Sequence, residues 1–104
     1  MKIYFVNSFF PSLDKAKEIG KIVLKRKLAA CVNINDKIKS FFWWKNKLSN
    51  ENEVELSFKT SFNKVTKLIE FLEKNHPYEC PCIIAFKVDK ANKKYIDWVL
   101  DQTK

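Results

Sequence analysis

The segment from residue 38 to residue 60 constrains the fold of this 104-residue chain more than any other. It contains four consecutive aromatic residues at positions 41–44, a polar break at positions 45–47, and then a run in which Val54, Leu56 and Phe58 alternate with polar residues. Successive side chains of a strand point to opposite faces, so the pattern predicts a long β-hairpin. Asn46 is the residue of the break that best tolerates a positive φ, so we expect the turn there.

The first strand of this hairpin predicts contacts beyond its own chain. Phe42 and Trp44 would share one face and Phe41 and Trp43 the other, so both faces are apolar. A small monomer rarely covers two such faces of one hairpin. We therefore expect one aromatic pair to enter the chain's own core and the other to be covered by a second copy.

Length and composition predict one domain, residues 1–104, with a single core. No stretch reaches the roughly 20 apolar residues that would span a bilayer, and the amino terminus lacks a signal-peptide pattern, so we expect a cytoplasmic protein without membrane insertion. Three cysteines are an odd number, which fits reduced thiols better than a disulfide framework.

The net charge of +8 raises the possibility of a nucleic-acid partner, but the type of basic residue argues against a specific one. Arg26 is the single arginine among twenty basic residues. Arginine supplies the bidentate fork that reads guanine edges and phosphate pairs, whereas scattered lysines give only diffuse attraction. We therefore expect no specific nucleic-acid binding.

The rest of the chain divides into further strands and helices. Three more strands are expected. The strand at residues 2–10 is apolar on both faces and so should be central in its sheet, and the strand at 82–88 should be buried on both faces. The strand at 29–34 should be followed by a bulge at Asn35–Asp36. Helices are expected after the N-caps Ser12, Ser61 and Asn92, the second with Phe62 in its inward stripe. The order β-α-β-β-α-β with an added helix predicts the ferredoxin-like fold, an α+β sandwich with an antiparallel sheet.

Candidate chemistry is concentrated in the sequence HPYECPC. His76, Cys80 and Cys82 lie within seven residues, and imidazole with thiolates suits copper(I) or zinc. The alternative is that His76 caps the preceding helix and the cysteines act as small hydrophobic residues. Glu53 and Glu55 could share acid and base roles, but a chain with one glycine offers no phosphate loop and no evident activated nucleophile, so we expect no enzyme.

Four motifs together resemble the CutA family of divalent-cation tolerance proteins. They are KRKLAACVNI, the hairpin SFFWWKNKLSNENEVELSFKT, the turn HPYECP and the closing KKYIDWV, in this order, and the resemblance extends over almost the whole chain. The resemblance implies a homotrimer of ferredoxin-like subunits, architecturally similar to PII signalling proteins, and an association with copper and other divalent ions.

Carried over residue by residue, the family pattern marks candidate ligand-binding positions at Cys31, Asn33, Trp44, Glu53, Lys59, Thr60, His76 and Tyr78, beside Pro77. The chain also departs from the pattern. Asn46 replaces a glycine, Cys82 a glutamate and Ala91 a glycine, while Ser8 and Asn75 stand where some relatives have cysteine and histidine. The last two changes remove soft donors and so weaken a copper site.

These observations predict a non-enzymatic homotrimer for divalent-ion tolerance, with copper or another divalent ion, or a small ligand, bound at a cleft between subunits. The alternative is a PII-like signalling or interaction module whose trimer surface is the functional element. The sequence names neither the ion nor a protein partner.

Overall fold

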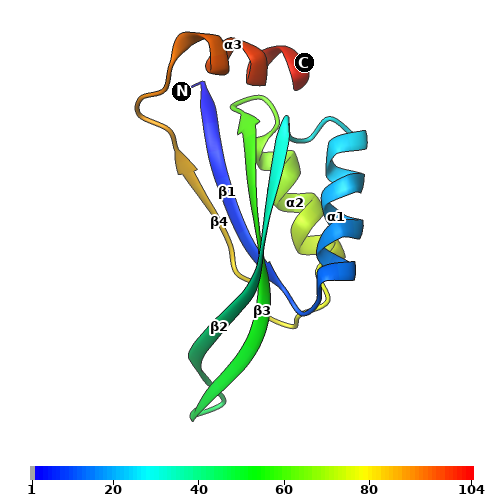
Figure 1. Ribbon diagram of the computed structural model, residues 1–104, viewed down its shortest axis with the longest axis vertical. Coiled ribbons are helices and arrows are strands. Elements are labelled where there is room, and N and C mark those ends of the chain that lie inside the picture. Colours follow the sequence, from blue (N-terminus) through cyan, green and yellow to red (C-terminus); the bar gives the residue numbers. More distant parts are fainter. Residues whose placement is uncertain (1) are drawn as a thin grey trace.

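A computed structural model describes residues 2–104 and has the expected order of elements (Figure 1). The four strands form one antiparallel sheet in the order β2-β3-β1-β4. This strand order, with two crossover helices and an added third helix, confirms the α+β, ferredoxin-like fold. The elements are β1 (Ile3–Phe10), α1 (Leu13–Lys25), β2 (Cys31–Trp44), β3 (Lys47–Ser61), α2 (Val65–Asn75), β4 (Ile83–Lys87) and α3 (Lys93–Gln102).

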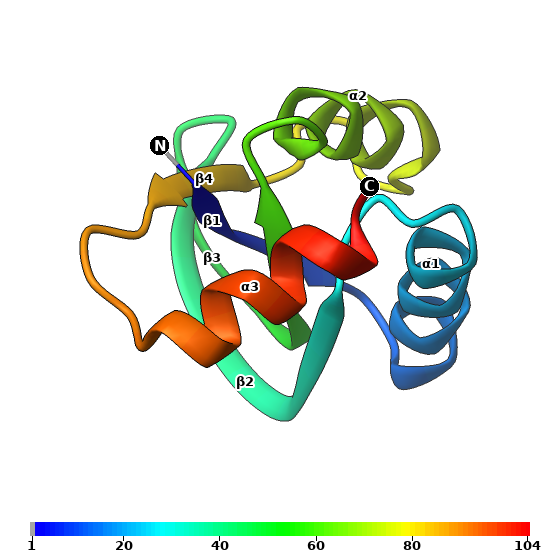
Figure 2. The ribbon, with the colours of Figure 1, turned by 90° about the horizontal axis from the view of Figure 1, so that it is seen from above.

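Helices α1 and α2 lie side by side on the same face of the sheet, and α3 lies across the end where β1 begins (Figure 2). β1 pairs with both β3 and β4, so its predicted central position is confirmed. The core fills the space between the sheet and the two helices. Its fully buried members include Val6, Phe10, Ala16, Val23, Leu56, Phe58, Leu68 and Leu72.

The hairpin extends past the body of the protein as an arm, residues 38–53 (Figure 1). β1 ends at Phe10, opposite Val54, so the part of β3 before Val54 pairs with β2 alone. The predicted bulge is confirmed, because the register shifts between Asn35 and Ile38. At the tip, Lys45 and Asn46 have φ values of 50° and 67°, as a two-residue hairpin turn requires, which confirms the turn at Asn46.

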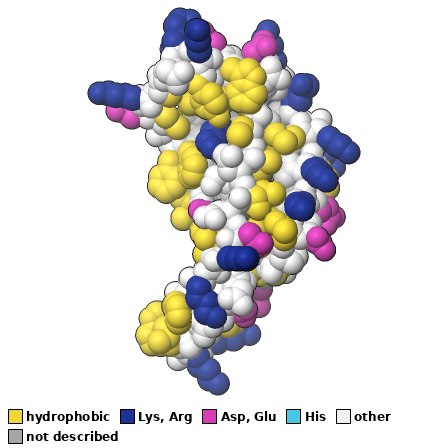
Figure 3. Space-filling view, in the orientation of Figure 1, with side chains coloured by type: hydrophobic (Ala, Val, Ile, Leu, Met, Phe, Trp, Pro, Cys, Tyr) yellow, Lys and Arg dark blue, Asp and Glu magenta, His cyan; other side chains and the backbone are white. Residues whose placement is uncertain are grey.

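The aromatic residues of the arm do not enter the core of their own chain. Phe41 and Trp43 are 69% and 73% exposed, and Phe42 and Trp44 keep 36% and 38% of their surface exposed. The prediction that one pair would enter the core is therefore wrong, because the arm lies beyond the end of the helix layer. Apolar side chains gather visibly at its end (Figure 3).

Three further predictions need correction. Ser61 does not cap α2, because it is the last residue of β3 and pairs with Ile3. Helix α2 begins only after Lys64, so Phe62 is not part of its inward stripe and is 59% exposed. The strand at 82–88 is not buried on both faces either. β4 is an edge strand with Ile84 and Phe86 about half exposed, because no helix covers that face.

The helix termini at Ser12 and Asn92 lie where they were expected. The Ser12 hydroxyl accepts a hydrogen bond from the Lys15 amide at 3.2 Å, as an N-cap does. Asn92 precedes α3, but its side chain makes no capping bond. In α3 only Val99 is fully buried, and Trp98 is partly exposed.

Candidate functional site

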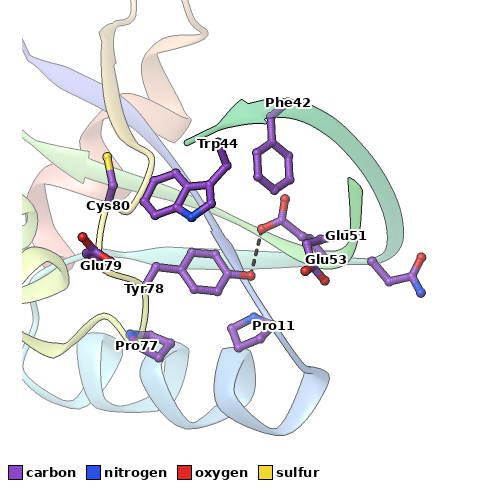
Figure 4. A pocket seen from close by; sticks show the side chains of 10 residues that line it. Pro11, Phe42, Trp44, Glu51, Glu53, Pro77, Tyr78, Glu79 and Cys80 are labelled. Atoms are coloured by element: carbon purple, nitrogen blue, oxygen red, sulfur yellow. Dashed lines mark hydrogen bonds between the residues drawn. The ribbon is translucent and has the colours of Figure 1, made fainter. Parts of the chain in front are cut away.

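A pocket of about 460 Å³ lies where the arm leaves the body of the protein. Tyr78 reaches into it from the loop after α2, with Trp44 and Phe42 on one side of its ring and Pro11 and Pro77 on the other (Figure 4). Its walls therefore combine aromatic surface with carboxylates. The lining residues are Pro11, Phe42, Trp44, Glu51, Asn52, Glu53, Pro77, Tyr78, Glu79 and Cys80.

One hydrogen bond joins the two sides of the pocket. The Tyr78 hydroxyl donates to a carboxylate oxygen of Glu53 at 2.8 Å, which ties the loop to the arm. Partial burial raises the pKa of Tyr78 above its usual value, and the bond to Glu53 and its negative charge add to this shift. Tyr78 therefore stays a neutral hydrogen-bond donor at physiological pH, and Glu53 keeps a second oxygen for a ligand.

His76 positions Tyr78 and belongs to the architecture of the loop. Its Nε2 lies 2.8 Å from the Phe9 carbonyl oxygen and donates to it, while its Nδ1 accepts from the Tyr78 amide at 3.2 Å. The imidazole also stacks on the Phe10 ring, with 4.3 Å between centroids. Burial lowers the pKa of His76, so the ring is held in its neutral form.

The structure does not assemble His76, Cys80 and Cys82 into a metal-ligand set. Within residues 2–104 no three His, Cys, Asp or Glu side chains are grouped closely enough to hold an ion. Both His76 nitrogens are already occupied by backbone groups. Burial, with the nearby Glu53 charge, raises the pKa of the Cys82 thiol and so disfavours the thiolate that a metal needs. All three cysteines are free, as expected, and His76 is the C-cap of α2.

The candidate positions taken from the family pattern divide between two places. Trp44, Glu53 and Tyr78 meet at the pocket, beside His76. The other positions lie at the opposite end of the sheet. There Lys59 donates to Asn33, the Cys31 thiol contacts Asn33 at 3.8 Å, and the Thr60 hydroxyl donates to the Leu28 carbonyl at 2.6 Å.

Two pocket carboxylates, Glu51 and Glu79, were missed from the sequence. Glu51 lies two residues before Glu53 in β3, and strand alternation was a sufficient signal for it. Glu79 gave no such signal, since its place depends on how the loop folds back onto the arm.

The departures Ser8 and Asn75 have structural roles in this chain. The Ser8 hydroxyl is fully buried and donates to the Cys82 carbonyl at 2.6 Å. The Asn75 side chain donates to the Phe71 carbonyl at 2.8 Å, within the last turn of α2.

The fold and this pocket define a small ferredoxin-like protein with an acidic, aromatic pocket and no assembled metal centre among its described residues. The family model described as "CutA1 divalent ion tolerance protein" matches residues 4–102. The chain therefore belongs to the CutA1 divalent ion tolerance family, which confirms the resemblance. This family is named for tolerance and not for a catalysed reaction.

Individual relatives agree. The chain is 39% identical over 99 residues to the divalent-cation tolerance protein CutA of Archaeoglobus fulgidus, and this match covers 95% of each protein. It is 40% identical over 94 residues to the divalent-cation tolerance protein CutA of Thermotoga maritima, and this match covers 90% of this chain and 92% of the relative. The crystal structure of the divalent ion tolerance protein CutA1 from Ehrlichia chaffeensis has a TM-score of 0.94 at 34% identity, covering 100% of this chain and 98% of that one.

Two observations bear on the expected location. The A. fulgidus protein is described as periplasmic in its solved structure. That structure has a TM-score of 0.93 at 36% identity, covering 98% of this chain and 99% of that one. In this chain, none of the described helices is both long and apolar enough to cross a membrane.

Proposed function

We propose that this chain acts in divalent-cation tolerance as a non-catalytic homotrimer. Its pocket takes a small ligand or a divalent ion, in a cleft that a neighbouring copy completes. The observation that carries this proposal is the pocket at the base of the arm, where Tyr78 and Glu53 meet beside Trp44. A concave site whose aromatic walls carry a few convergent polar groups is a usual form of a ligand site.

The exposed surface of the arm supports the homotrimer. Phe41, Trp43 and the facing Leu48 are each about two-thirds or more exposed, and strand alternation places all three on one face. An aromatic side chain buries roughly 150–250 Å² when it is covered, so contact with a second copy would remove a large apolar area from water. A closed assembly would also cover the edges of β2 and β4.

A copper or other divalent ion would need donors from more than one chain. Two soft donors of one chain are poorly suited to a metal, because His76 bonds backbone groups through both nitrogens and burial raises the pKa of the Cys82 thiol. The carboxylates of the pocket suit a harder divalent ion, but they do not converge within the described part of one chain. Carboxylates from a neighbouring copy could complete a hard-ligand set.

The state of His76 supports the absence of catalysis. A general base needs a free nitrogen within reach of the substrate proton, and both nitrogens of the only histidine face backbone groups. Purified protein should therefore show no hydrolase or phosphatase turnover that depends on His76.

Sedimentation equilibrium tests the assembly. At micromolar concentration the wild type should sediment at three times the chain mass, whereas a Trp43→Ala/Trp44→Ala variant should be monomeric or insoluble. Lys90→Ala, in the exposed segment between β4 and α3, is the control and should leave the mass unchanged. A wild-type mass equal to one chain would contradict the homotrimer.

Titration of reduced protein tests the pocket. Zinc and copper(I) should perturb the Trp44 indole signal, and Glu53→Gln should weaken the response, since it removes one carboxylate of the lining. Glu70→Gln on α2 removes the same charge outside the pocket and should have no effect. Equal responses of the two variants would contradict a role for this pocket.

The exposed arm also favours the second candidate function, a PII-like module whose trimer surface contacts other proteins. This function requires that a pocket ligand alters the arm. Amide exchange of residues 38–53 should then slow when a ligand binds at Trp44, and unchanged exchange would contradict it.

The cytoplasm remains our proposed location. Three free thiols, two of them exposed, fit a reducing compartment.

A further inference from the structure

A second cleft lies on the helix layer, away from the arm and its pocket. It has a volume of about 550 Å³ and forms between the C-terminal end of α1 and the length of α2. Four of its seven lining residues are basic and none is acidic. The lining residues are Arg26, Leu28, Lys64, Lys67, Phe71, Lys74 and Asn75.

Helix α2 presents a row of basic residues to the cleft. Residues spaced by three, four and seven positions share a face of a helix, so Lys67, Phe71 and Lys74 line up along the cleft. Glu70, three and four residues from Lys67 and Lys74, borders this row but does not line the cleft, while Glu73 falls on a different face and Leu68 and Leu72 face the core. The lining of the cleft is therefore basic, with no acidic side chain in it.

These cations are not neutralised by the protein. Within residues 2–104 the ion pairs closer than 4 Å lie on α1 and at α3, as in Lys15–Glu18 and Lys93–Asp97. In α2, Lys67 and Lys74 lie three and four residues from Glu70, a spacing that often gives such pairs, yet neither forms one. Like charges that share a cleft repel one another, and an anion would relieve that repulsion.

Arg26 is the fixed element of the cleft. It is the only arginine of the chain and the C-cap of α1, and its guanidinium carbon lies 5.0 Å from the centre of the Phe71 ring. This cation–π contact holds the planar group in place. The guanidinium carries its N–H donors as a planar fork, and that fork matches phosphate oxygens.

We propose that this cleft binds a linear chain of linked phosphates, with Arg26 on one phosphate and the lysines of α2 along the rest. The row from Lys64 to Lys74 spans about 15 Å of helix, which is longer than a single phosphate. Lysine ammonium groups are compact charges that bind phosphate oxygens without fixed geometry. Arg26 lies over the Phe71 ring, so that face is not available to a nucleobase, and we assign the recognition to the phosphates.

This site is independent of the proposed function. The cleft shares no lining residue with the pocket at the arm, and it lies on the helix layer rather than on the arm whose aromatic face we assign to the homotrimer. A phosphate ligand could therefore bind the assembled protein.

Calorimetric titration of the full chain with tripolyphosphate tests the proposal. We expect saturable binding that weakens as salt is added, because exposed charges are screened. Arg26→Gln/Lys67→Gln should weaken binding about tenfold or more, since each change removes a charged hydrogen-bond donor. Lys90→Gln/Lys94→Gln removes the same two charges elsewhere on the surface and is the matched control, expected to change binding less than about twofold.

Further ligands define the specificity. Orthophosphate should bind much more weakly than tripolyphosphate. ATP as tight as tripolyphosphate indicates that the phosphate chain alone is read, as proposed, whereas clearly tighter ATP would show that the base or ribose is also recognised and would contradict the assignment to phosphates. Three results would overturn the proposal, because each would indicate a general polyanion surface. These are equal weakening of tripolyphosphate binding in the two double variants, binding of orthophosphate as tight as that of tripolyphosphate, and equally tight binding of an oligonucleotide of the same charge.

Discussion

Replacement of His76 should destabilise the protein, because its ring holds the loop after α2 against the end of β1. His76→Ala removes the bonds to the Phe9 carbonyl and the Tyr78 amide, and the stack on Phe10. A net hydrogen bond contributes about 0.5–1.5 kcal/mol and an aromatic contact a similar amount, so the loss should be about 2–4 kcal/mol. Urea unfolding of the reduced protein, at fixed protomer concentration, measures this difference.

A second variant separates the two contributions. His76→Phe keeps an aromatic ring against Phe10 but can neither donate to Phe9 nor accept from Tyr78. It should recover only the stacking part of the loss, about 1 kcal/mol. A loss below about 0.5 kcal/mol for His76→Ala would refute the structural role assigned here, because an unsatisfied backbone group alone costs more than that.

Other predictions concern pH, packing and thiols. Burial lowers the pKa of His76 below its unfolded value of 6.5, so the unfolded chain binds the proton more readily than the folded one. The contribution of His76 to the free energy of unfolding should therefore be complete above pH 6.5 and be lost as the pH falls through the folded-state pKa. Urea unfolding between pH 7 and pH 5 should show this loss in the wild type but not in His76→Phe. Phe58→Ala, at a fully buried core position, should cost about 3–5 kcal/mol in the same assay, and an effect under 1 kcal/mol would contradict its core position. Thiol titration should find three free thiols, with Cys82 slower than Cys80 because its pKa is raised; a count of one would contradict reduced cysteines.

Local patterns in the sequence predicted most of the fold. Alternation in β3 placed Val54, Leu56 and Phe58 on the core face, and all three are buried. The helix expected after Ser12 is present as well, and its Ala16 and Val23 are buried. These predictions succeeded because each depends only on the period of one element.

The errors arose where distant partners decide the outcome. Ser61 has the composition of an N-cap, but its pairing with Ile3 extends β3 and delays the helix to Val65. In β4 the apolar run indicated burial on both faces, yet its edge position leaves Ile84 and Phe86 partly exposed. No local pattern reports the place of a strand in its sheet.

The two sites show the same limit. Glu53 and Tyr78 are 25 residues apart, and they meet only because the loop after α2 folds back onto the arm. Arg26 and Phe71 come together through the packing of α1 against α2. The sequence drew attention to Arg26 only as the single arginine, and it gave no sign of the lysine row that faces it across the cleft.

The end of β1 links the ligand pocket to the exposed arm. Pro11 follows Phe10 and has no N–H with which to continue the pairing, so β1 stops opposite Val54. Strand β3 begins seven residues before Val54, so its residues 47–53 have no partner in β1. That difference in length leaves the arm without a third strand, which exposes Phe41 and Trp43. It also opens the space beside Glu53 that Tyr78 only partly fills, with Pro11 as one wall. Because one strand end produces both features, a second copy that covered the arm would lie next to the pocket, and assembly and ligand binding should affect one another.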